Sequence, residues 1–461
     1  MNATGDNPTG DRLSRWTPAM FACALVNLGL GLALAVLGLA WPAAPAAAPA
    51  SLAMVHLLTI GWLTLLMFAA LFQFVPVITS RALPSQTPPL VALIGIEAGL
   101  ALMVAGFLSL GDGTALLLPA GGALVIAALA LGAGTLLVPL LAKRPMPLSA
   151  RFVVAGLGFL LLTVLLGLCF ALALAVPALG PALAPLLAGG LAAHALAGIG
   201  GWFTLTAIGV SYELLPMFML APHDRGVLGA TVLWTGTAGF LAAVFAGLAG
   251  AFWPAVMLAA LATAGRLAIC VALALYLFDV GRLYRSRMRR RIELHNRAAI
   301  GAFGSLGLAV LLGLGAILAQ RLEALAPSLV LLLLLGWLSG LGLTQLYKIV
   351  AFLSWLSRYG TRLGRGAVPR VQDLVHEPAA TWLFALYFGA VGLAALAAAL
   401  TGVPGRAEAI RGALAVALVA VLLLGREYLR AWRASYVRPP NVGPAATPAA
   451  PLIPAGKDGT R

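Results

Sequence analysis

The stretch HALAGIGGWFTLTAIGVSYELLPMF, residues 194–218, is an almost unbroken apolar run that holds a Gly-Trp pair and a single carboxylate. As a helix it is about 37 Å long, which exceeds the roughly 30 Å hydrocarbon core of a bilayer. The same Gly-Trp pair recurs in MVHLLTIGWLTLLMFAALFQFVP, residues 54–76, and in LVLLLLLGWLSGLGL, residues 329–343. These three stretches predict membrane-spanning helices and an internal repeat.

The composition of the whole chain agrees with this. Of 461 residues, 62% are hydrophobic and 9% are charged, whereas soluble domains are about 45–50% apolar and 25% charged. Water-soluble enzymes and disordered chains are therefore excluded, and an all-α polytopic membrane protein is predicted. The three cysteines lie in apolar runs without a pairing motif, which is typical of packing residues.

With a spanning length of roughly 20 apolar residues as the criterion, the chain contains twelve predicted helices. Several are longer than a straight span requires, so we expect tilt or protruding ends. The predicted spans are 17–41, 51–79, 89–110, 114–141, 149–178, 183–220, 227–248, 252–281, 298–319, 328–356, 381–401 and 409–431.

Basic residues predict the orientation. With the N-terminus inside, all but four of the 29 Lys and Arg residues fall in inner segments; the exceptions are Arg321, Arg406, Arg411 and Arg266. This positive-inside bias predicts that both termini are cytoplasmic, and it assigns the net charge of +15 to basic loops at a lipid bilayer rather than to nucleic-acid binding. We divide the chain into a cytoplasmic segment 1–16, a membrane domain 17–436 and a disordered tail 437–461.

The repeat extends beyond the Gly-Trp pairs. Trp62, Trp202 and Trp337 are 140 and 135 residues apart, four spans each time. We therefore predict three four-helix units, about 17–141, 149–281 and 298–431, related by a pseudo-threefold axis; the alternative is ordinary helix packing, with Gly for close approach and Thr or Ser for hydrogen bonds. The matched positions are Thr64, Thr204 and Ser339, then Phe72, Tyr212 and Tyr347, then Gln73, Glu213 and Lys348, and finally Pro76, Pro216 and Ala351.

Twelve helices in three groups of four resemble the catalytic subunit of the haem–copper oxidases and their nitric-oxide-reductase relatives. The second predicted helix looks like their haem-bearing helix, and the sixth looks like short oxidase-like bacterial membrane proteins and, loosely, NnrS-type proteins. The resemblance implies that His56 matches an axial ligand of the low-spin haem and His194 a copper ligand. It also implies a bacterial inner membrane, with respiratory-chain components as partners.

The chain departs from the family at several of its ligand positions. Gly198 stands where many members have Tyr, the span 227–248 has no His, and the tenth span carries Leu where the family has its remaining haem ligands. We therefore expect an oxidase-like fold without a complete oxygen-reducing centre. Haem b or copper at His56 and His194 is the cofactor expectation, and no cofactor at all is the alternative.

Imidazole inside a membrane is a site hypothesis by default, although His56 and His194 could also form hydrogen bonds between helices. Soft Met side chains near them would suit Cu(I) but are also common core residues. Five polar residues within the predicted spans are further candidates for a functional role, and unpaired charges among them would be costly. We expect Glu213 to face the interior with Lys348 as its first partner, unless Lys348 extends to the inner surface. The five are Gln73, Glu97, Glu213, Arg266 and Lys348.

Three functions stay open at this point. The first is an oxidase-like protein that binds haem or copper in a respiratory or nitrosative-stress context. The second is a transporter or channel that uses the same helices without a metal, for which an intramembrane carboxylate can relay protons. The third is a degenerate structural or assembly subunit. The residues do not decide whether the protein is an enzyme, and no nucleotide-binding loop or serine-nucleophile motif is present.

Overall fold

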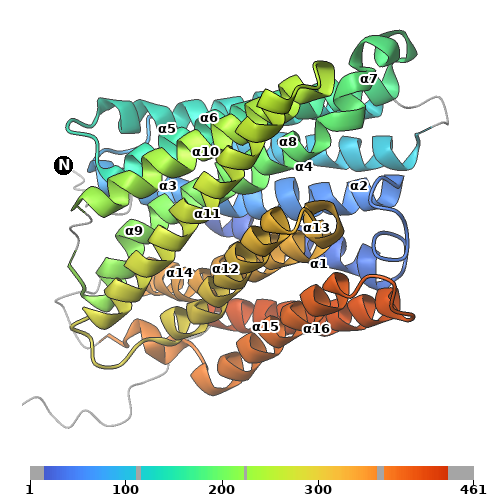
Figure 1. Ribbon diagram of the computed structural model, residues 1–461. Helices are drawn as coiled ribbons and strands as arrows, with labels where there is room; N and C mark the ends of the chain where they lie inside the picture. Colours follow the sequence, from blue (N-terminus) through green and yellow to red (C-terminus); the bar gives the residue numbers. More distant parts are fainter. Residues whose placement is uncertain (1–14, 111–115, 223–225, 361–367, 434–461) are drawn as a thin grey trace, which may run out of the picture.

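The computed structural model describes residues 15–110, 116–222, 226–360 and 368–433. Within these ranges the chain forms helices and no strand, so the all-α prediction is confirmed. The segment 1–14 and the predicted tail 437–461 lie outside the described residues. Figure 1 shows the long helices lying side by side, with their axes close to one common direction.

Among the described residues, twelve helices are long and apolar enough to cross a membrane, as predicted. Their ends differ from the predicted boundaries by up to eight residues. The nine regular spans are α1 (Thr17–Val36), α4 (Thr87–Leu108), α5 (Leu117–Ala142), α6 (Leu148–Ala175), α10 (Gly226–Phe252), α11 (Val256–Arg285), α12 (Leu294–Leu318), α15 (Glu377–Ala399) and α16 (Arg406–Arg433).

The other three spans are composite, and each contains a π-helical segment that holds a Gly-Trp pair. The π-helix is rare and is frequently found at functional sites, and no feature of the sequence predicted it. The second span is α2 (Pro49–His56), η1 (Leu57–Thr64) and α3 (Leu65–Thr79); the sixth is α8 (Leu191–Ala195), η3 (Leu196–Thr204) and α9 (Leu205–Met219); the tenth is α13 (Leu322–Val330), η4 (Leu331–Ser339) and α14 (Gly340–Tyr359).

One predicted boundary is wrong. The sixth span does not begin at residue 183, because the apolar run before it forms a separate short helix, α7 (Gly180–Gly189), after the turn η2 (Pro177–Leu179). The pair Gly189-Gly190 interrupts the helix there, since glycine is a poor helix former. Helix α7 packs against α6 and α10 at one end of the bundle (Figure 1).

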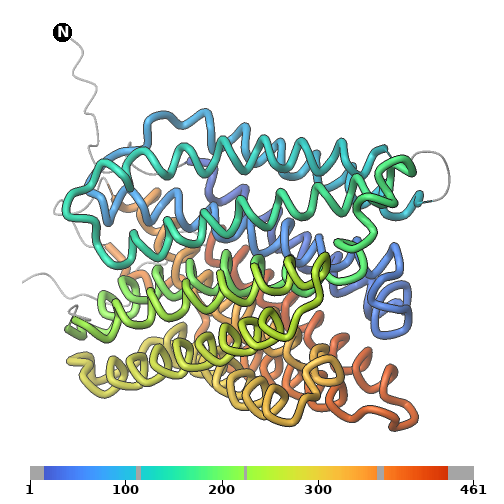
Figure 2. Tube along the Cα trace, turned by 45° about the horizontal axis from the view of Figure 1, so that its top comes forward, coloured from blue at the N-terminus to red at the C-terminus, as the bar shows by residue number. Residues whose placement is uncertain are grey.

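The first and last helices close the bundle. Helices α1 and α16 pack against each other, and Figure 2 shows the long helices running alongside one another through the molecule. The Arg411 guanidinium of α16 donates to the carbonyl of Val36, the last residue of α1, with an Nη2–O distance of 3.0 Å. This satisfies a carbonyl that the helix end leaves without an intrahelical partner.

Hydroxyl side chains in the spans are mostly satisfied within their own helices. Thr79 and Thr135 each donate to the carbonyl four residues earlier. In the π-helical segments the acceptor lies five residues earlier, because the turn is wider. There Thr204 donates to Ile199 and Ser339 to Leu334. Such internal bonds let polar side chains stay in a medium that offers no water.

The three tryptophans of the Gly-Trp pairs are fully buried, and two of them donate to the predicted Thr/Ser positions. Trp62 Nε1 donates to Ser339 Oγ at 2.8 Å, and Trp202 Nε1 donates to Thr64 Oγ1 at 3.4 Å. The second span is thereby bonded to both the tenth and the sixth. Trp337 Nε1 has no hydrogen-bond partner among the described residues. The matched positions therefore meet in the core, while their relation by a common threefold axis stays a prediction.

Trp62 donates a hydrogen bond and Trp337 donates to no described residue, and this difference can be tested with a matched pair of variants. We expect Trp62→Phe to lower the free energy of unfolding by about 1 kcal/mol more than Trp337→Phe, because only the first loses a net hydrogen bond. Both lose a similar ring volume, so packing effects largely cancel. Thermal unfolding of the purified protein in detergent measures the difference. Equal losses in the two variants would contradict the bonding pattern.

Each Gly-Trp glycine lies against an earlier helix at a distance that leaves no room for a side chain. A Cβ on Gly61 would lie 2.6 Å from Asn27 Cγ of α1, and one on Gly336 would lie 2.6 Å from Ser305 Cβ of α12. On Gly201 it would lie 2.2 Å from the Phe159 ring of α6. The glycines are thus required for close approach of helices, as in membrane proteins generally.

Candidate functional site

His56 is the last residue of α2, directly before the π-helical segment η1. Its Nδ1 lies 2.7 Å from the carbonyl oxygen of Leu52 in the same helix, so Nδ1 carries the proton and Nε2 is left with a free lone pair. The imidazole also packs on Phe107 of α4, with ring centroids 5.0 Å apart. A hydrogen bond from one ring nitrogen to a carbonyl oxygen is the usual arrangement that fixes the tautomer of a metal-binding His.

His194 lies in α8, two residues before the π-helical segment η3. Its ring packs edge-on against Phe170 of α6, with centroids 5.5 Å apart and planes at 82°. The Cε1 atom is also beside Gly167 of the same helix. The Nδ1 atom is buried and has no hydrogen-bond partner among the described residues. A buried nitrogen without a partner is costly, so this atom is a candidate position for a ligand.

His56 and His194 are called the imidazole region below. His56 directly precedes the π-helical segment η1, and His194 lies two residues before η3. The third segment, η4, has no His before it. Among the described residues no group of three or more His, Cys, Asp or Glu side chains is arranged to hold a metal ion. Any metal bound here would therefore rely on one or two imidazoles.

The matched polar residues Gln73, Glu213 and Lys348 each contact the beginning of the helix that starts their own set of four spans. Gln73 Nε2 donates to Thr17 Oγ1 of α1 at 2.6 Å. Ser149 Oγ of α6 donates to Glu213 Oε2 at 3.4 Å. Lys348 Nζ lies 2.5 Å from Oε2 of Glu293, the residue before α12.

These contacts correct the expectation that Glu213 pairs with Lys348. They also bear on whether Lys348 extends to the inner surface. Glu213 is half-buried and hydrogen-bonded, as expected, but the partner found for Lys348 is Glu293. Each matched residue reaches its own first helix, so the two charges need not meet each other. Lys348 is an ion-pair partner with 16% of its side chain exposed, which favours pairing over extension to the surface.

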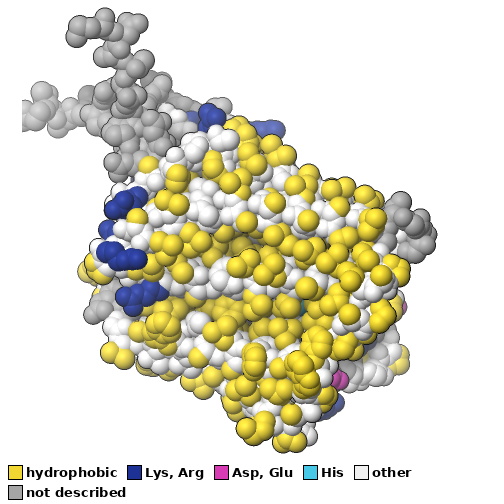
Figure 3. Space-filling model, turned by 90° about the horizontal axis from the view of Figure 1, so that it is seen from above, with side chains coloured by type: hydrophobic (Ala, Val, Ile, Leu, Met, Phe, Trp, Pro, Cys, Tyr) yellow, Lys and Arg dark blue, Asp and Glu magenta, His cyan; other side chains and the backbone are white. Residues whose placement is uncertain are grey.

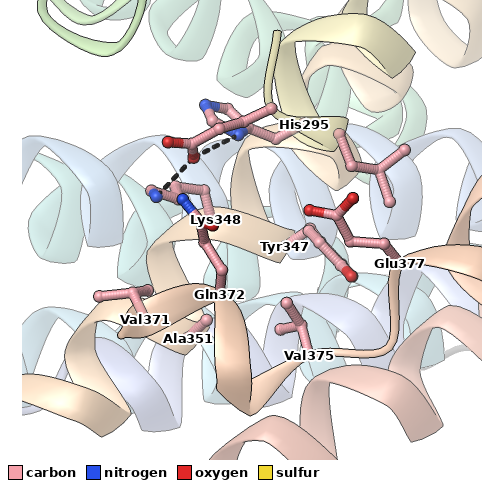
Figure 4. A pocket seen from close by; sticks show the side chains of 10 residues that line it. His295, Tyr347, Lys348, Ala351, Val371, Gln372, Val375 and Glu377 are labelled. Atoms are coloured by element: carbon pink, nitrogen blue, oxygen red, sulfur yellow. Dashed lines mark hydrogen bonds and ion pairs between the residues drawn. The ribbon is translucent and has the colours of Figure 1, made fainter. Parts of the chain in front are cut away.

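Glu293 is the centre of a charged cluster. Besides Lys348, its carboxylate binds the Arg289 guanidinium and lies 3.5 Å from His295 Nδ1. Figure 4 shows Lys348 and His295 on either side of this carboxylate, with Tyr347 and Glu377 across the adjoining cavity. The cavity volume of about 20 Å³ is enough for about one water molecule, so this pocket is too small for an organic substrate.

Glu97 of α4 forms a contact in the middle of the bundle. Asn27 Nδ2 of α1 lies 2.9 Å from Glu97 Oε1 and 3.4 Å from the carbonyl oxygen of Gly61 in η1. Asn27 is 5% exposed and Glu97 is half-buried. The amide thus joins two spans and a π-helical segment. Arg266 of α11 is also half-buried and forms no ion pair with a described residue.

Sequence reasoning missed Asn27, Ser149 and Glu293. Asn27 had a signal, since it is a carboxamide inside an apolar span, and such residues form hydrogen bonds between membrane helices. Glu293 and His295 lie at the end of a basic loop and look like surface residues. Only the tertiary contact with Lys348 distinguishes them.

The chain was compared with known families and with curated proteins. Neither comparison finds a match for it.

Proposed function

We propose that the protein is an oxidase-like membrane protein that binds haem iron or copper at His56 and His194 beside a respiratory chain or in nitrosative-stress handling. It does not form a complete oxygen-reducing centre. The proposal rests on the hydrogen bonding of the two imidazoles. The Nδ1 of His56 is fixed by Leu52, and the buried Nδ1 of His194 has no described partner.

The donor set fits a metal that accepts neutral imidazole. Imidazole suits copper and iron, and a fixed tautomer offers Nε2 of His56 at little reorganisation cost. Haem iron or copper bound there would supply one-electron transfer. The protein contributes orientation through Leu52 and Phe107 and an apolar surrounding through Phe170.

The test measures the absorption spectrum and the metal content of the purified protein and its variants. We expect His56→Ala and His194→Ala each to lower metal per protein at least about tenfold, because loss of an outer partner alone reduces metal affinity about 10–100-fold. The exposed His376 gives the control His376→Ala, which should keep the wild-type content.

The spectrum separates the two metals and the rival functions. A Soret band assigns haem, whereas stoichiometric copper without that band assigns copper. If the wild type carries neither, or both variants keep the wild-type cofactor, the proposal fails. A transporter or channel without a metal, or a structural or assembly subunit, then becomes the leading interpretation.

We also infer that the basic end of the bundle faces the cytoplasm of a bacterial inner membrane. Most Lys and Arg side chains visible in Figure 3 gather at one end. Two of the exceptions cap helix ends: Arg411 binds the carbonyl of Val36, and Arg406 binds those of Ala397 and Ala398. Both arginines thus cap carbonyls at helix C-termini. Labelling of single cysteines introduced at the two ends tests the orientation.

A further inference from the structure

Glu97 and Asn27 each lie midway along a membrane-spanning helix. Glu97 is ten residues from the start of α4 and eleven from its end, and Asn27 is ten from the start of α1 and nine from its end. At 1.5 Å per residue both side chains are therefore about 15 Å from either end. This is half the thickness of the hydrocarbon core.

The contacts of Glu97 provide hydrogen bonding without charge neutralisation. Its carboxyl oxygen meets the Asn27 amide at 2.9 Å, and no described Lys, Arg or His forms an ion pair with it. A charged side chain at this depth costs at least a few kcal/mol. The same carboxyl is much less costly when it holds a proton, so the site distinguishes strongly between its two protonation states.

The elements around Glu97 supply few other titratable groups. Helix α4 packs against α5, η1 and α3, which carry none within the membrane, and against α2, which carries His56. His56 is beside Phe107, ten residues or about 15 Å along α4 from Glu97. The remaining group is the Cys23 thiol of α1, four residues or about one turn before Asn27. The carboxyl is thus the principal acid of this region.

We propose that Glu97, Asn27 and the carbonyl of Gly61 form a proton-binding site at the bilayer midplane, separate from the imidazole region. Asn27 donates to both oxygens, so it holds Glu97 against the π-helical segment in one geometry. Proton uptake and release at Glu97 changes the strength of the contact between α1 and α4, because a hydrogen bond to a charged acceptor is stronger than one to a neutral group. Carbonyls of irregular helix segments at the midplane serve similar sites in transporters.

The experiment uses dicyclohexylcarbodiimide, an apolar reagent that enters the bilayer and modifies carboxyl groups in their protonated form. The full-length protein in liposomes is labelled over a series of pH values, and the modified peptides are measured by mass spectrometry. We expect Glu97 to be labelled at acidic pH, with the rate falling about tenfold per pH unit once the group ionises. The control carboxyl is Glu408 near the start of α16, which is outside the apolar core.

Two variants make the assignment specific. Glu97→Gln should abolish labelling of that peptide and remove one carboxyl band from the infrared pH titration. Asn27→Leu should keep labelling up to a higher pH, because it removes the donor that stabilises the carboxylate. His56→Ala and His194→Ala should leave labelling unchanged, so this proposal can fail or stand independently of metal binding.

Two results would overturn the proposal. One is the absence of labelling at Glu97 at every pH, and the other is labelling that does not change between acidic and alkaline pH. In the second case Glu97 is a permanently neutral packing group. Both results are read on the wild-type protein, so neither depends on the folding of a variant.

Discussion

Replacing Gly201 by alanine is expected to lower the free energy of unfolding by about 3 kcal/mol, at the upper end of the usual cost of overpacking. The added Cβ would lie 2.2 and 2.3 Å from Cγ and Cδ1 of Phe159. An aromatic ring buried among neighbours cannot move away by a small rotation, so the helices themselves have to separate. The apparent melting temperature in detergent and the yield of monodisperse protein measure the effect.

A neighbouring glycine provides the control for this prediction. Gly158, next to Phe159 on α6, has open space where its Cβ would be. Gly158→Ala is therefore expected to be neutral or stabilising by up to about 1 kcal/mol, through helix propensity alone. The double variant Gly201→Ala with Phe159→Ala should be less destabilised than the sum of the single variants, because the smaller residue leaves room for the new methyl. Additive effects would argue against the steric cause.

Removing the Glu293 carboxylate is expected to have the second large effect on stability. We expect Glu293→Ala to lower the free energy of unfolding by about 3 kcal/mol, since breaking a buried ion pair costs about 3–5 kcal/mol. The value lies at the lower end because Lys348 keeps some access to water. Without Glu293, the positive charges of Lys348 and Arg289 face each other with no anion between them. Chemical or thermal unfolding in detergent gives the measurement.

The comparison for this variant is an exposed ion pair. Arg370 and Asp373 lie 3.2 Å apart with most of the arginine side chain in solvent. Asp373→Ala should therefore cost no more than about 1 kcal/mol. The double variant Glu293→Ala with Lys348→Met should recover part of the loss, because it also removes the cation that was left unpaired. If Glu293→Ala and Asp373→Ala have the same small effect, the cluster does not stabilise the fold.

The spans could be predicted because the bilayer imposes a single strong requirement, a continuous apolar run of sufficient length. The Gly-Trp repeat likewise indicated the core, since Trp62 and Trp202 are buried and bonded through Thr64 and Ser339. The π-helical segments could not be predicted, because their sequences are as apolar as those of ordinary spans. Helix α7 was missed for the same reason.

For each polar site, the sequence indicated one residue but not its partner. His56, His194 and Glu97 were noticeable because they interrupt apolar runs. Their partners were not, since Leu52 contributes a backbone carbonyl and Asn27 lies 70 residues from Glu97. The pairing of Lys348 with Glu293 depends on where a loop of basic residues meets the bundle, which no local pattern encodes.

The unequal bonding of the three tryptophans has a mechanical consequence. The indoles of η1 and η3 are tied to neighbouring spans, whereas Trp337 of η4 is surrounded by the rings of Tyr276 and Phe303 and donates to no described acceptor. Contacts between rings can slide, while a directional bond has to break. We therefore expect the sixth and tenth spans to separate from each other under lateral tension in the membrane more readily than either separates from the second span.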